Sequence, residues 1–270
     1  MSLCLLHLTD IHFGCENKAA VAAALGYAHG RRFDAVIVTG DITQAGERRE
    51  FEAAKAWMAL LPQPVLCAPG NHDTPYFDLG ARLFAPWARY AGYIGQAAFE
   101  GVARAGLNAV TFNTARGAQP RLNWSKGQAR EADVREVLRR LRPDEPGLKV
   151  VACHHPLMEV TGGPMTGRVW GGRRASQLLA EGGADLILTG HVHMPFAHPL
   201  PFGDGRTYSL GASTLSLRER GCPAGFSVIE ADETQIRATA LAWTGHGFEA
   251  QRSWGFDRRP SPAPVPAHAV

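Results

Sequence analysis

Through its first two thirds, the chain alternates between short apolar runs and longer segments in which apolar residues recur at every third or fourth position. Short apolar runs are typical of buried strands, and the wider spacing is typical of amphipathic helices. The runs that predict strands are 3–10, 35–41, 64–70, 108–114, 149–155 and 185–191, and the segments that predict helices are 18–32, 47–61, 125–142 and 173–183. The alternation predicts an α/β fold whose strands lie buried between layers.

The last third of the chain has a different pattern. Residues 206–214, 225–232 and 234–243 are β-type runs separated by turns, and they predict neighbouring strands of a second or extended sheet with antiparallel pairing. From Arg258 onward the sequence RRPSPAPVPAHAV is rich in proline and alanine. We therefore expect a single domain over residues 1–257 and a flexible tail over residues 258–270.

Composition narrows the class of protein. A chain of 270 residues with 45% hydrophobic content can bury a substantial core. The formal net charge of +3, without long runs of either sign, disfavours a dedicated nucleic-acid binder. The N-terminus lacks a basic leader, and no apolar run approaches the roughly 18 residues of a membrane span. These features predict a soluble, cytoplasmic protein without a membrane partner, and they leave a homo-oligomer open.

Side chains that can bind metals follow five of the predicted strands. Asp10 and His12 are two residues apart at the end of an extended run, so they point to the same side of it. Open α/β sheets bind ligands beyond the carboxyl ends of their strands, so we expect the polar groups at these ends to converge. The groups after the other strands are Asp41, then Asn71, His72 and Asp73, then His154 and His155, and finally His191 and His193.

The candidate ligand set suggests a pair of metal ions. It comprises seven side chains, namely Asp10, His12, Asp41, Asn71, His154, His191 and His193. This set is too large for one tetrahedral ion but suits two ions that share a carboxylate. The charge left after the two aspartates have offset part of two divalent ions suits a hydroxide and a phosphodiester anion. Imidazole and carboxylate ligands without thiolate favour Mn, Fe, Zn or Co in a divalent or trivalent state.

The motifs DxH, GD, GNHD, HHP and GHVH occur in this order between residues 10 and 193, and together they resemble the calcineurin-like metallophosphoesterase superfamily. The resemblance implies a four-layer αββα sandwich of two mixed β-sheets with a binuclear centre between them. It implies one ion at Asp10, His12, Asp41 and His193, and a second at Asp41, Asn71, His154 and His191. It also implies that His72 stabilises the phosphoryl oxygens or protonates the leaving group, and that Asp73 orients it.

Two departures narrow the branch of the superfamily. The block GDITQAG lacks the Asp and Arg that follow GD in serine/threonine protein phosphatases, and it lacks the tyrosine ligand of purple acid phosphatases. The third block ends in Asp73, where protein phosphatases commonly have Glu. The remaining resemblance is to bacterial phosphodiesterases that act on cyclic nucleotides or glycerophosphodiesters. It implies that metal-bound hydroxide attacks a small phosphodiester in line.

Other functions and contacts stay open at this point. The alternatives are a nucleotide-lipid pyrophosphatase or nuclease of the same superfamily, and a non-catalytic metal-binding scaffold. Two long loops, 114–127 and 158–174, carry Arg and Trp, which suit a phosphate and a flat group. Candidate substrate contacts are Arg173, Arg174 and His155, although His155 also fits a packing position beside the ligand His154.

Overall fold

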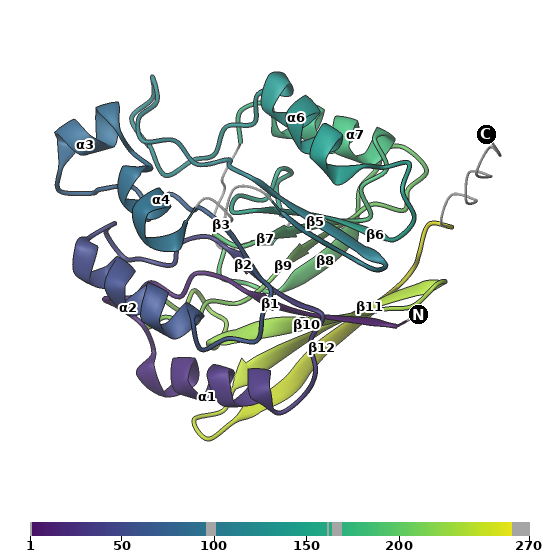
Figure 1. Cartoon of the computed structure of the whole chain (residues 1–270), viewed down its shortest axis with the longest axis horizontal. Helices are drawn as coiled ribbons and strands as arrows, with labels where there is room; N and C mark the ends of the chain where they lie inside the picture. Colours follow the sequence, from purple (N-terminus) through teal and green to yellow (C-terminus); the bar gives the residue numbers. More distant parts are fainter. Residues whose placement is uncertain (1, 96–100, 161, 164–168, 261–270) are drawn as a thin grey trace, which may run out of the picture.

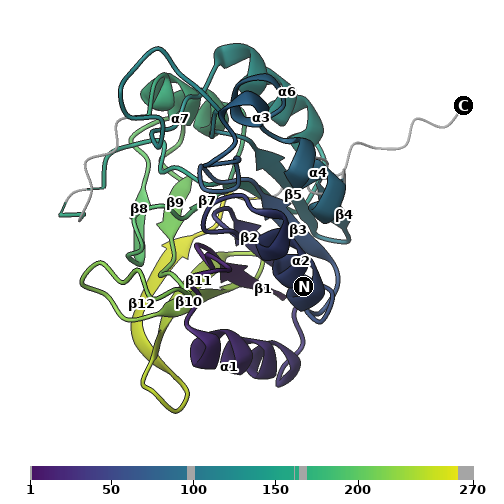
Figure 2. The same cartoon turned by 90° about the vertical axis from the view of Figure 1, so that its left-hand side faces the viewer.

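Two six-stranded sheets lie face to face, with helices on both outer sides (Figures 1 and 2). The structure is a computed structural model that describes residues 2–95, 101–160, 162–163 and 169–260. Its helices are α1 (Lys18–His29), α2 (Arg48–Met58), α3 (Leu79–Phe84), α4 (Ala88–Ile94), α6 (Glu131–Leu141) and α7 (Gly172–Glu181). The four layers and two mixed sheets confirm the predicted αββα sandwich.

Each sheet combines parallel and antiparallel pairs. The first has the order β12-β11-β10-β1-β2-β3, in which β1 pairs in parallel with β2 and antiparallel with β10. Its strands are β1 (Leu3–Leu8), β2 (Ala35–Thr39), β3 (Val65–Ala68), β10 (Gly225–Ala231), β11 (Gln235–Trp243) and β12 (Phe248–Asp257). The second has the order β4-β5-β6-β7-β9-β8. Its strands are β4 (Val102–Arg104), β5 (Leu107–Phe112), β6 (Leu148–Cys153), β7 (Leu186–Thr189), β8 (Phe196–Pro199) and β9 (Tyr208–Gly211).

The strands are apolar on both faces because each sheet is covered on both sides. In β1, Leu3 and Leu5 pack into the core between the two sheets, where they join Leu148 of β6. Leu6 and Leu8 point the other way, into a core that includes residues of α1 and α2. A third core packs the outer face of the second sheet against α6 and α7. Three apolar layers therefore hold the strand ends in fixed relative positions.

The C-terminal strands differ in part from the prediction. β10 and β11 are antiparallel neighbours, as expected, but β9 belongs to the other sheet and runs parallel to β7. The separation follows from the segment 212–224, which carries the chain from the second sheet to the first. The segment 125–142 was predicted as one helix, but α6 begins only at Glu131. The backbone of Gln128 and Ala129 pairs with Trp170 instead of continuing the helix.

The end of the described chain is packed against the domain. After β12, Arg258 is buried and its backbone N donates to the carbonyl of Thr234 at 2.6 Å. Arg259 forms an ion pair with Asp204 at 2.8 Å. The tail was expected from Arg258, and its residues 261–270 lie outside the described residues. Across the described ranges, every helix is too short or too polar to cross a membrane.

Candidate metal centre

The predicted ligands meet where the carboxyl ends of strands from both sheets face each other. Asp10, Asp41 and Asn71 follow β1, β2 and β3 of the first sheet, and the ligand histidines 154 and 191 follow β6 and β7 of the second. Nε2 of His193 lies 3.0 Å from Oδ1 of Asp10. Across the sheets, Nε2 of His154 lies 3.2 Å from Oδ2 of Asp41.

The ligand atoms form overlapping groups. In one group, donor atoms of Asp10, His12 and His193 lie within 4.8 Å of one another, and in another the same holds for Asp10, Asp41 and His154. Nε2 of His12 lies 3.7 Å from Oδ1 of Asp10 and 3.8 Å from Oδ2 of Asp41. Asp41 thus lies between groups that include His12 and His154, which is where a bridging carboxylate would be needed.

Several ligands have an unusual backbone conformation. Six described non-glycine residues have positive φ, and five of them are predicted ligands, namely Asp10, His12, Asp41, His191 and His193. Such angles are uncommon for side chains other than glycine, and they persist where the surrounding structure enforces them. Here the backbone N of Asp10 donates to the carbonyl of Gly40, and that of His12 donates to the carbonyl of Asp41, both at 3.0 Å. These hydrogen bonds link the turns after β1 and β2.

Backbone carbonyls fix the orientation of two ligand imidazoles. Nδ1 of His154 lies 2.8 Å from the carbonyl oxygen of Thr39, and Nδ1 of His193 lies 2.6 Å from that of Arg218. A carbonyl only accepts, so Nδ1 carries a proton in both rings and Nε2 is the nitrogen that faces the cluster. This is the usual arrangement for metal-ligating histidine.

Unpartnered buried atoms show that the cluster suits metal ions. Nε2 of His12, Oδ1 of Asn71 and Nε2 of His191 are buried without a hydrogen-bond partner in the described structure. Leaving one such group unsatisfied costs about 1–3 kcal/mol, so several at one place fit a site for a bound cation. Nitrogen and oxygen donors of this kind fit transition-metal cations.

The electrostatics keep the two carboxylates ionised. Burial alone would raise the pKa of Asp41, but the neighbouring His154 and His72 hold it well below its usual range. Burial would likewise raise the pKa of Asp10, but His193 and His12 hold it well below its usual range. Burial lowers the pKa of the His12 imidazole to about 4, so its ring is neutral near pH 7. The two anionic aspartates and the neutral His12 are therefore available together.

His72 lies at the edge of the ligand cluster. Its backbone N donates to Oδ1 of Asp41 at 2.8 Å, and its Nδ1 lies 2.6 Å from the carbonyl oxygen of Gln44. The carbonyl of Gln44 therefore orients the ring, a role that was expected of Asp73. Asp73 is buried and accepts hydrogen bonds from the backbone N of Thr43 at 2.9 Å and of Gly70 at 2.8 Å. It holds the two turns that carry Asp41 and His72.

Both ring nitrogens of His155 are already engaged. Nδ1 lies 2.9 Å from Oγ1 of Thr114, and Nε2 lies 2.8 Å from the carbonyl oxygen of Ser125. With the ring buried and both nitrogens occupied, the geometry favours the packing position over a substrate contact. His155 thus ties loop 114–127 to the end of β6.

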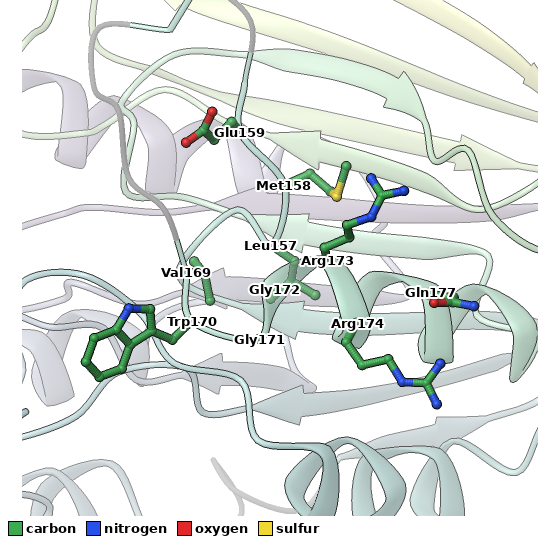
Figure 3. A pocket seen from close by; sticks show the side chains of 10 residues that line it. All are labelled: Leu157, Met158, Glu159, Val169, Trp170, Gly171, Gly172, Arg173, Arg174 and Gln177. Atoms are coloured by element: carbon green, nitrogen blue, oxygen red, sulfur yellow. The ribbon is translucent and has the colours of Figure 1, made fainter.

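The structure places Arg173 and Arg174 on the wall of a separate cavity of about 810 Å³ (Figure 3). Both arginines extend from the start of α7. The guanidinium of Arg173 lies over the ring of Phe202, and Nε of Arg174 lies 3.8 Å from a carboxylate oxygen of Glu131. None of these contacts involves a predicted metal ligand.

Arg218 and Arg220 were not anticipated. Nη1 of Arg218 lies 3.0 Å from Nε2 of His72, and Nη1 of Arg220 donates to the carbonyl of His191 at 2.8 Å. Both belong to the loop between β9 and β10, which carries no recognisable motif. The only indication in the sequence is that the segment SLRERG follows the strand β9. The carboxyl end of β9 lies beside that of β7, which carries two ligand histidines.

Replacing Gly190 by alanine is expected to disturb the cluster directly. A Cβ atom there would overlap Oγ1 of Thr9 and Oδ2 of Asp10. We expect the free energy of unfolding to fall by about 1–3 kcal/mol, as for overpacked cores. We also expect the variant to bind less metal than the wild type. Urea unfolding and elemental analysis would measure both.

The matched control is Gly92→Ala in α4, where a Cβ would meet no atom within 4 Å. That variant should be as stable as the wild type or more stable by up to about 1 kcal/mol. Equal stability and metal content for Gly190→Ala and the wild type would contradict the prediction.

Comparisons with known proteins agree with this geometry. The family model of the calcineurin-like phosphoesterases matches residues 5–195. A probable cyclic nucleotide phosphodiesterase of Synechococcus sp. is 24% identical over 256 residues, which cover 90% of this chain and 93% of that protein. The glycerophosphodiester phosphodiesterase GpdQ of Enterobacter lignolyticus is 35% identical over 80 residues, which cover 26% of this chain and 29% of GpdQ.

A solved structure shows the same fold. Purple acid phosphatase PPD1 from yellow lupin (Lupinus luteus) seeds matches with a TM-score of 0.70 at 14% identity. The match covers 96% of this chain and 54% of the phosphatase chain, so this chain spans about half of that protein. The family match extends over most of the chain and includes all seven predicted ligands. The chain therefore belongs to the calcineurin-like phosphoesterase family, as its motifs implied, and it is a phosphoric ester hydrolase.

Proposed function

We propose that the protein is a binuclear metal-dependent phosphodiesterase that hydrolyses a small phosphodiester, either a cyclic nucleotide or a glycerophosphodiester. The observation that carries this proposal is the group of buried, unpartnered ligand atoms at the carboxyl ends of strands from both sheets. The relative that matches along most of the chain is named as a probable cyclic nucleotide phosphodiesterase. The match to GpdQ covers a shorter part of the chain and supports the glycerophosphodiester alternative.

In this proposal the ligands divide as the family resemblance implies. Asp10, His12 and His193 would hold one ion, Asn71, His154 and His191 would hold the other, and Asp41 would be shared. When bound, the ions would neutralise phosphate charge and lower the pKa of the attacking water. The two ionised aspartates limit the positive charge of the centre, which leaves it suited to a singly charged diester.

The chain's own groups would complete the reaction. Gln44 holds Nδ1 of the His72 ring, which leaves Nε2, the nitrogen that Arg218 contacts in this structure, to face a phosphate oxygen or the leaving group once it carries a proton. We assign His72 to stabilising the phosphoryl oxygens or protonating the leaving alkoxide. The backbone carbonyls of Thr39 and Arg218 accept from Nδ1 of His154 and His193. They thereby keep Nε2 of each ring directed at the proposed metal site.

The first test measures metal content and substrate preference together. Protein reconstituted separately with Mn, Fe, Co and Zn should bind about two ions per chain, as in two-metal hydrolases, and should hydrolyse an aryl phosphodiester faster than its monoester. Cyclic AMP and glycerophosphocholine would then separate the two substrate classes. Bound metal without turnover of any ester would favour the scaffold alternative. Strongly salt-dependent DNA binding with DNA cleavage would favour the nuclease, and turnover confined to nucleotide-lipid pyrophosphates would favour the pyrophosphatase.

A further inference from the structure

The loop that carries Arg218 is tied firmly to the site by its backbone. The hydroxyl of Thr214 donates to the carbonyl of Asp10 at 2.6 Å, and the backbone N of Leu217 donates to the carbonyl of Cys15 at 3.0 Å. The carbonyl of Arg218 accepts from Nδ1 of His193 at 2.6 Å. The starting point of the Arg218 side chain is therefore fixed relative to the ligands after β1 and β7.

The guanidinium of Arg218 reaches across the site toward the turn after β2. Its Nη1 lies 3.2 Å from Oε1 of Gln44 and 3.0 Å from Nε2 of His72. An arginine only donates, so Nε2 of His72 is the acceptor, which agrees with a proton on Nδ1 facing the carbonyl of Gln44. The neighbours of the guanidinium are thus an amide oxygen and an imidazole nitrogen, and neither is a carboxylate.

The positive charge of Arg218 has no carboxylate opposite it within the described part of the chain. The side chain is only half-buried, so it stays accessible from solvent. Some arginines elsewhere are paired with a carboxylate, for example Arg259 with Asp204 and Arg116 with Asp133. An unneutralised guanidinium beside His72 is suited to an anion, and its planar set of donors matches the oxygens of a phosphate.

We propose that Arg218 is a substrate-binding residue that donates to a non-bridging oxygen of the phosphoryl group, on the side of the site where His72 lies. The proposal rests on the proposed function, because it places a phosphoester at this centre. The residue then has two separable contributions. Its backbone carbonyl orients His193, and its side chain binds the phosphate.

Because the backbone and the side chain of Arg218 have different contributions, a substitution of the side chain tests phosphate binding alone. Arg218→Gln keeps the backbone carbonyl and removes the charge, so metal content should match the wild type. Titration calorimetry of the Mn-reconstituted protein with inorganic phosphate should show binding weakened by about 10- to 100-fold, the usual effect of losing a charge-assisted hydrogen bond. KM for an aryl phosphodiester should rise, and Arg218→Lys should restore part of the phosphate affinity.

Arg237→Gln is the matched control, because Arg237 is an exposed arginine on β11 and the substitution changes net charge equally. It should leave phosphate affinity unchanged. Unchanged phosphate affinity in Arg218→Gln, an equal loss in Arg237→Gln, or loss of metal from Arg218→Gln would each overturn the inference. If the wild type hydrolyses no ester but phosphate binding still depends on Arg218, the proposed function fails and the anion site stands.

Discussion

Asp41→Asn is expected to lose both metal ions and to reduce diester hydrolysis by at least about a thousandfold, since metal charge contributes several kcal/mol to such reactions. The substitution is nearly isosteric, and the remaining amide oxygen can still accept from the backbone N of His72. What it removes is the negative charge between groups that include His12 and His154. Without that charge, the proposed shared ligand has lost its main attraction for two cations.

The measurement is elemental analysis of the reconstituted variant, alongside turnover of an aryl phosphodiester. Asp144→Asn provides the control, because Asp144 is exposed and lies in the turn after α6. That variant should bind metal and turn over substrate like the wild type. If Asp41→Asn kept two ions per chain and most of its activity, Asp41 would not be the shared ligand.

His72→Ala is expected to lower kcat by about 100- to 10,000-fold, the range for a positioned acid or electrostatic stabiliser, while metal content stays normal. The backbone N of His72, which supports Asp41, is unaffected by the substitution. Only the imidazole held by Gln44 is lost. The expected pattern is therefore the reverse of Asp41→Asn, with a loaded centre and slow chemistry.

A substrate with a better leaving group separates the two roles of His72. If the imidazole protonates the leaving alkoxide, the loss should shrink for an activated aryl ester, which needs no acid. If it stabilises the phosphoryl oxygens, the loss should be similar for activated and unactivated diesters. His246→Ala, at an exposed histidine near the C-terminus, should behave as wild type. Full activity of His72→Ala on both substrates would remove His72 from the mechanism.

The ligand positions could be predicted from sequence because they follow strands in short motifs. Asp10, His12 and Asp41 come directly after apolar runs, so their placement depends only on where β1 and β2 end. Arg218 gave no such signal, because its role depends on a loop whose position is set by pairing of β9 with β7 and of β10 with β1. The sheet to which β9 belongs is a long-range property that the local pattern of apolar residues does not carry.

The orientation of the His72 ring also depends on the fold and not on the local sequence. The family resemblance implied that Asp73 orients the ring of His72. In the structure Asp73 bonds backbone groups of Thr43 and Gly70, and the carbonyl of Gln44 takes the ring nitrogen. A sequence motif does not indicate which backbone carbonyl will accept from a side chain. Every residue has a carbonyl, and only the fold decides which one lies near the ring of His72.

The pairing of β1 with β10 also governs when the centre can form during synthesis. Asp10 is synthesised well before its partner His191, which follows 181 residues later, and the strand that flanks β1 ends at Ala231. Contacts so distant in sequence are slow to form, because the intervening chain must be ordered first. A nascent chain therefore holds scattered histidines and carboxylates without a site, and the centre can form only after the residues up to Ala231 have been synthesised.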